Sequence, residues 1–202
     1  MNSQYVRRSL KEETLRRCKL VAVIVAAVIG FSANHAFAQE FTANLDGFDE
    51  IGFIQGPYTG AILSHGTATA KLYLDQKAHT ISYTLTYSNV GTTPPLTGTV
   101  TQAHIHFGKK RDSGGILVFF CSNLGNGPTG TPACPLNSGT VTGTWTNDSV
   151  VAIPEQNVNA DDFDALVQAL TSDTGYANIH SSGLPNGELR GQVQNSKRGK
   201  SN

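Results

Sequence analysis

Apolar and polar residues alternate with a period of two over much of the chain after residue 40. In 67–74 Ala and Leu alternate with Thr, Lys and Tyr, and in 81–87 Ile, Leu and Tyr alternate with Ser and Thr. Successive side chains of a β-strand point to opposite faces, so each segment predicts a strand with one buried face. The residues between them, 75–78, predict a short hairpin loop.

Shorter segments of the same kind predict further strands. They lie at 41–45, 100–107, 116–121, 140–146, 177–180 and 188–193, separated by connections rich in Gly, Pro, Asn and Ser. About eight such strands predict an all-β protein, built as an antiparallel β-sandwich or β-barrel.

One segment has helical spacing instead. Its apolar residues recur at i, i+3, i+4 and i+7: Phe163, Leu166, Val167 and Leu170. This spacing predicts one short helix near 160–171, which Asn159 can cap, and Asp161 and Asp162 suit the positive end of its dipole. A calcium site formed by these two residues and Asp164 is the less favoured alternative, because no Gly-containing ligand loop surrounds them.

The first 38 residues differ from the rest. Six basic residues lead into an apolar run from Leu20 to Phe31, and the small-residue motif Ala36-Phe37-Ala38 follows. These features predict a secretory signal peptide over 1–38, cleaved between Ala38 and Gln39. The run of about 12 residues is shorter than the roughly 20 needed to span a bilayer, so we expect no transmembrane segment after cleavage. Arg7-Arg8 faintly indicates a twin-arginine export signal.

The charge balance changes once this leader is removed. The whole chain has 15 Lys and Arg and 15 Asp and Glu, which gives a formal net charge of zero. Without the six basic and two acidic residues of the leader, 9 basic and 13 acidic residues remain, a net charge of −4. This balance excludes a general nucleic-acid binder, which needs excess positive charge. Residues 195–202 predict a disordered basic tail, which leaves a domain over 39–194.

Two cysteines remain in the mature chain, Cys121 and Cys134. An even pair in an exported protein predicts one disulfide, worth about 3 kcal/mol on a chain-entropy argument. A pair of metal or redox thiols is less favoured, because the spacing is wide and no C-x-x-C motif is present.

Three histidines share the polar positions of predicted strands. In 103–107 the residues Ala103, Ile105 and Phe107 would face the core, which places His104 and His106 together on the other face. The same alternation in 177–180 and 188–193 assigns five further residues to outward positions: Asn178, His180, Glu188, Arg190 and Gln192.

This outer surface has two interpretations. Imidazoles two apart on a strand can hold copper or zinc, so His104, His106 and His180 are candidate ligands. Alternatively, these groups form a polar hydrogen-bond network supported by Asn178 and Gln192, in which Glu188 and Arg190 pair. The sequence favours the network. It offers no catalytic residue, because no Gly-x-Ser-x-Gly or phosphate-binding glycine loop is present.

Several segments resemble the CHRD domain, a family named after chordin. They are 41–47, 66–70 with the following hairpin, the His-x-His-x-Gly motif at 103–108, and the closing blocks at 175–180 and 185–193. The resemblance spans about residues 41 to 193 and implies an extracellular or periplasmic β-rich module. In chordin such domains belong to a protein that binds bone morphogenetic proteins.

The His104-Ile105-His106 strand also faintly resembles the copper-binding strand of copper/zinc superoxide dismutase, and Arg190 loosely resembles its closing arginine. No histidine lies between His106 and His180, so the bridging and zinc ligands are missing. The expected sandwich or barrel is therefore immunoglobulin-like or superoxide-dismutase-like.

We expect an exported, non-enzymatic CHRD-domain module of the envelope or extracellular space that binds an extracellular or envelope ligand. The alternative is a mononuclear copper or zinc protein with a three-His surface site, and a redox enzyme of superoxide-dismutase type is least favoured.

Overall fold

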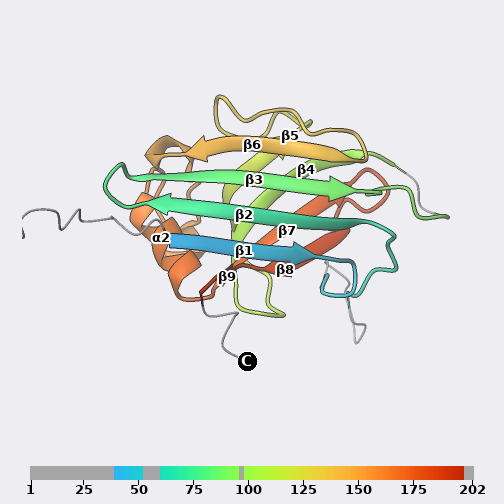
Figure 1. Cartoon of the computed structure of the whole chain (residues 1–202), viewed down its shortest axis with the longest axis horizontal. Helices are drawn as coiled ribbons and strands as arrows, with labels where there is room; N and C mark the ends of the chain where they lie inside the picture. The colour runs from blue at the N-terminus through green and yellow to red at the C-terminus, as the bar shows by residue number, and fades with distance from the viewer. Residues whose placement is uncertain (1–38, 52–59, 96–97, 198–202) are drawn as a thin grey trace, which may run out of the picture. The chain divides into compact units, whose positions relative to one another are not determined.

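Two antiparallel β-sheets face each other across an apolar core (Figure 1). The computed structural model describes residues 39–51, 60–95 and 98–197; the predicted signal peptide and its cleavage site at Ala38 lie outside or at the edge of these ranges. The first sheet has the order β6 (Gly139–Trp145), β3 (Thr80–Ser88), β2 (Thr67–Asp75), β1 (Gln39–Leu45) and β9 (Gln194–Asn195). The second has the order β5 (Ile116–Ser122), β4 (Val100–Phe107), β7 (Gly175–Ser181) and β8 (Leu189–Gln192).

This arrangement confirms the all-β prediction and resolves it to a sandwich rather than a closed barrel. The described chain holds nine strands instead of about eight. The extra strand is β9, where Asn195 pairs with Phe41 and Gln194 with Thr42 of β1. Two residues are too few to produce a visible alternation, so the pattern missed this strand. Asn195, which the sequence analysis placed in a basic tail, therefore belongs to the sheet.

The predicted alternation positions the core. In β2 and β3 every second side chain is buried between the sheets, and the two strands pair along their whole length, from Thr67 opposite Ser88 to Asp75 opposite Thr80. Tyr83 of β3 stacks on Trp145 of β6 with ring centroids 4.5 Å apart. Burial of one face per strand is the main stabilising contribution expected for this fold.

The sheets approach closely where β1 meets β8. Asp46 and Arg190 exchange two backbone hydrogen bonds, with N···O distances of 3.2 and 2.9 Å. At Gly191 a Cβ atom would lie 2.1 Å from the backbone oxygen of Asn44. Only glycine can occupy this position, because any side chain would push β1 away from β8.

The predicted helix is present as α2 (Phe163–Thr171), but its cap differs from the prediction. Asp162 is the N-cap and accepts a hydrogen bond from the backbone N–H of Ala165 at 2.9 Å. The proposed cap Asn159 is wrong because it lies three residues too early, whereas a capping side chain must reach the N–H groups of the first turn. Two short 3-10 helices, η1 (Asn147–Ser149) and η2 (Pro154–Gln156), precede α2.

Cys121 and Cys134 form the predicted disulfide, with their Cα atoms 5.1 Å apart. Cys121 belongs to β5, whereas Cys134 lies in the loop that leads to β6. Asn123 accepts a hydrogen bond from the backbone N–H of Cys134 at 2.9 Å and donates to its carbonyl at 3.1 Å. The disulfide therefore attaches a loop without regular secondary structure to the edge strand β5.

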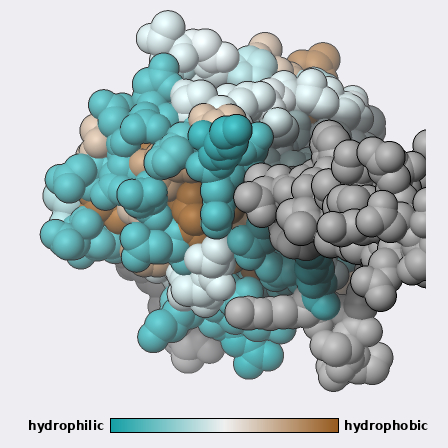
Figure 2. Space-filling view, turned by 60° about the vertical axis from the view of Figure 1, so that its left-hand side comes forward, coloured by the Kyte–Doolittle hydropathy of each residue, from teal (hydrophilic) through white to brown (hydrophobic). Residues whose placement is uncertain are grey.

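The described residues include no helix that is long and apolar enough to cross a membrane. The face of the molecule drawn in Figure 2 is mostly hydrophilic, with hydrophobic residues in small separate areas. This face therefore has the character expected for contact with water.

Candidate metal centre

Strands β4 and β7 bring the three histidines together. In their antiparallel register His106 lies opposite Tyr176, His104 opposite Asn178, and Gln102 opposite His180. Directly opposite and diagonal residues of neighbouring strands share a face. The His104 ring consequently lies between the other two, with centroids 4.6 Å from His106 and 4.7 Å from His180. Ala103 and Ile105 are fully buried on the opposite, core-facing side of β4, as predicted.

The three imidazoles can each direct one nitrogen to a common point. The candidate ligand atoms of His104, His106 and His180 all lie within 4.8 Å of one another. No other group of three or more His, Cys, Asp or Glu with such spacing occurs within the described ranges. The aspartates at the start of α2 accordingly do not form a cluster of this kind.

Backbone carbonyls fix the orientation of two rings. Nδ1 of His106 lies 2.8 Å from the carbonyl oxygen of Gly114, and Nδ1 of His180 lies 2.9 Å from that of Pro185. A carbonyl can only accept, so each Nδ1 carries the proton and each Nε2 has its lone pair exposed to the cluster. Hydrogen bonds of this type orient metal-binding histidines in known sites.

The remaining ring nitrogens have no hydrogen-bond partner among the described residues. They are Nδ1 and Nε2 of His104, Nε2 of His106 and Nε2 of His180, and all are buried. A buried polar atom without a partner costs about 1–3 kcal/mol. Four such atoms side by side are therefore the feature of this site that the surrounding hydrogen bonds do not explain.

The cluster lies beneath loops, which corrects the prediction of a surface site. His104 is only 1% and His180 8% exposed. Loops packed on the outer side of the second sheet cover the polar face, so it forms a second, polar interior. Burial, and secondarily the neighbouring imidazoles, hold the pKa of His104 well below its usual value, and burial lowers the pKa of His106 to about 4 and also lowers the pKa of His180. All three rings are neutral near pH 7, as metal ligands must be.

Only some of the predicted polar partners join the histidines. Asn178 and Arg190 line the same small pocket as His106 and His180. Gln192 instead donates to carbonyls at the end of β4 and around α2, at Gly108, Asp173 and Gly175.

Glu188 also lies apart from the histidines, where it accepts hydrogen bonds from Ser64 and the backbone of Gly91. The expected pair between Glu188 and Arg190 is wrong, because Arg190 donates to the carbonyls of Lys109 and Asp112 and packs over the Tyr176 ring. Alternation placed both residues on one face without indicating which loops cover them.

Two residues of the site were not predicted. Tyr176 stacks on His106 with an interplanar angle of 4° and centroids 4.7 Å apart, and the guanidinium carbon of Arg190 lies 3.4 Å from the centroid of the Tyr176 ring in a cation–π contact. Tyr176 lies two residues before Asn178 on the same strand, so strand alternation already places both side chains on one face. Glu50 is 4% exposed and accepts from the Asn178 side chain at 2.5 Å, but it lies in an irregular loop that has no periodic pattern.

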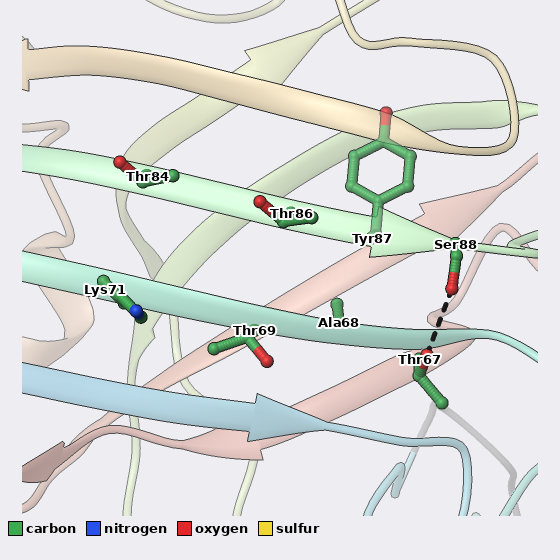
Figure 3. A pocket seen from close by; sticks show the side chains of 8 residues that line it. All are labelled: Thr67, Ala68, Thr69, Lys71, Thr84, Thr86, Tyr87 and Ser88. Carbon is green, nitrogen blue, oxygen red and sulfur yellow. Dashed lines mark hydrogen bonds between the residues drawn. The ribbon is translucent and has the colours of Figure 1, made fainter.

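The larger hollow on the molecule lies elsewhere. About 450 Å³ of space adjoins the outer face of β2 and β3, where the hydroxyls of Thr67 and Ser88 share a hydrogen bond at 3.2 Å (Figure 3). The residues that line this hollow include one cation, Lys71, and several hydroxyls, but no His, Cys, Asp or Glu. The smaller pocket, which His106 and His180 line, is therefore the better candidate for a functional site.

One comparison with known proteins identifies a family for this chain. The family model described as the CHRD domain matches residues 41–193, which is most of the chain and includes all three histidines. No curated protein and no solved structure gives a significant match. The match begins in β1 and ends just after β8, so it covers both sheets and the candidate centre. The chain belongs to the CHRD domain family.

Proposed function

We propose that this CHRD domain is an exported module that binds one copper or zinc ion through His104, His106 and His180. One observation carries the proposal: the imidazoles of buried His104 and His180 and of half-buried His106 converge, and their inward nitrogens have no hydrogen-bond partner among the described residues. Imidazole nitrogen is a preferred ligand of both metals.

The competing interpretation is a purely structural hydrogen-bond network. It accounts for Asn178, which donates to Glu50 and to the carbonyl of Leu189, and for Arg190 with its two carbonyl acceptors. It does not account for the histidines, because their inward nitrogens face one another rather than polar partners. The polar residues around the cluster therefore support the loops, whereas the histidines have a separate role.

The spacing requires a small contraction when an ion binds. Three nitrogens that lie within 4.8 Å of one another share a central point no more than about 2.8 Å from each, whereas metal–nitrogen bonds are about 2.0–2.1 Å. Each nitrogen therefore has to move toward an ion at that point by at most about 0.7 Å. Rotation of the rings about their side-chain torsions supplies movements of this size.

Export is supported by the leader and by the disulfide. The basic, apolar and small-residue regions of 1–38 have the order of a secretory signal, and disulfides persist in oxidising compartments. In such a compartment the module binds an extracellular or envelope ligand. The metal centre is the part of its binding site whose chemistry the residues indicate.

The test is metal analysis of untagged protein recovered from the exported fraction, after loading with copper or zinc and removal of excess ion. We expect one bound ion per chain and an intact mass that matches a chain whose first residue is Gln39. A saturating metal concentration of 100 times Kd should raise the free energy of unfolding by about 2.7 kcal/mol. His104→Ala/His106→Ala should lose both the ion and this stabilisation.

The matched control removes two histidines that lie outside the cluster. His65 and His79 are exposed, so His65→Ala/His79→Ala should bind metal as the wild type does. His180→Gln is a second site variant that preserves side-chain volume if the double alanine variant folds poorly. Equal metal content in wild type, site variants and control would refute the metal centre and leave a structural module.

A further inference from the structure

We propose that the bound metal ion keeps one coordination position open toward a pocket, and that a small inorganic anion binds there. This inference rests on the proposed metal centre and adds the class of ligand that the centre takes.

The pocket adjoins the histidines directly. It has a volume of about 120 Å³, and His106, His180, Tyr176 and Asn178 form its inner wall. One water molecule needs only about 10–15 Å³ of such space, so the pocket has room for several water-sized groups. His104 does not line the pocket and lies deeper, at 1% exposure. An ion held by all three rings would thus be reached from one side, past His106 and His180.

The protein supplies three ligands and no more within the described ranges. No fourth His, Cys, Asp or Glu joins the cluster. Glu50 lines the pocket, but its oxygens accept from the Asn178 side chain at 2.5 Å and the Ile51 backbone at 2.9 Å. Sites with three protein ligands commonly complete a tetrahedron with an exogenous group.

The positive charge of the metal ion favours an anion as the ligand at its open coordination position. An imidazole that coordinates a metal does so as the neutral ring, so a divalent ion bound by three of them brings two positive charges into a largely buried site. The pocket wall contains one carboxylate, Glu50, and one guanidinium, Arg190, whose charges offset each other. The ion's charge therefore remains uncompensated by the wall, and a small anion bound to the ion reduces this imbalance.

The test uses mature protein loaded with one equivalent of Cu(II) and titrated with sodium azide, a three-atom anion. We expect a saturable azide-to-copper charge-transfer absorption and a matching change in the copper electron paramagnetic resonance spectrum. Asn186 is an exposed residue of the pocket wall, so Asn186→Trp should fill the entrance. It should weaken azide binding at least tenfold while leaving the copper content unchanged.

Ser82→Trp is the matched control, because Ser82 is exposed on β3 of the other sheet. It should bind azide as the wild type does. Copper-loaded wild type that shows no azide band, or an Asn186→Trp variant with unchanged azide affinity, would overturn the open position while the metal centre stands. Absence of bound copper in metal analysis would instead refute the metal centre, and the inference with it.

Discussion

Arg190 connects the loop after β4 to the strand that borders the site. Its Nη2 atom donates to the carbonyls of Lys109 and Asp112 at 3.2 and 2.9 Å, and its guanidinium lies over Tyr176, which stacks on His106. Arg190 itself is 3% exposed. A planar cation with several donors can make all these contacts at once, whereas an ammonium cannot. Arg190 is therefore a positioning residue for one wall of the pocket.

We predict that Arg190→Lys lowers the free energy of unfolding by about 2 kcal/mol, since it loses a charged hydrogen bond and the ring stacking. Urea denaturation followed by tryptophan fluorescence measures the change. Arg111→Lys is the control, because Arg111 is exposed, and it should change the stability by less than about 0.5 kcal/mol. Equal stability of Arg190→Lys and the control would contradict the assigned role.

The residues of the site were predictable to the extent that they follow the strand period. His104, His106, His180, Asn178 and Arg190 were found because alternation assigns a face to each. What alternation cannot supply is the position of loops. The carbonyls that orient the rings and the carboxylate of Glu50 come from irregular segments, whose paths depend on tertiary packing.

At the scale of elements, strands were predicted better than their ends and connections. A strand repeats its pattern over seven to nine residues, so β2 and β3 were found with nearly their observed bounds. The first residue of α2 depends on which single side chain caps the helix, and several neighbouring Asn and Asp residues are candidates for the N-cap. Asp162 is the cap because it directly precedes Phe163, the first residue of the helix.

We predict that Asp162→Ala costs about 1 kcal/mol of stability, because the N–H of Ala165 loses its acceptor and the helix dipole loses a carboxylate. The midpoint of urea denaturation measures the loss. Asn159→Ala is the matched variant at the position that the sequence suggested, and it should remain within about 0.5 kcal/mol of the wild type. A larger loss in Asn159→Ala than in Asp162→Ala would show that the cap is misassigned.

For the whole molecule, the disulfide and the candidate metal centre lie in different parts of the second sheet. Cys121 lies on β5, across from Ala103 of β4, and Cys134 closes the loop toward β6. The candidate metal ligands lie on β4 and β7, and the loops whose carbonyls orient His106 and His180 begin after β4 and β7. The sandwich thus has a covalent fastening at the edge of the second sheet and a polar interior near its middle.

Because these features are separate, we predict that loss of the disulfide lowers stability without emptying the metal centre. The bond joins residues separated by 13 positions, and closing a loop of this size stabilises by about 3 kcal/mol. Cys121→Ala/Cys134→Ala should lose about this amount in urea denaturation yet still bind one zinc ion per chain. Wild type treated with a thiol reductant should match the variant in stability, which separates the effect of the bond from that of the lost sulfur atoms. If zinc content instead falls in parallel with stability, the centre depends on the covalent fastening of β5, and the two features act as one unit.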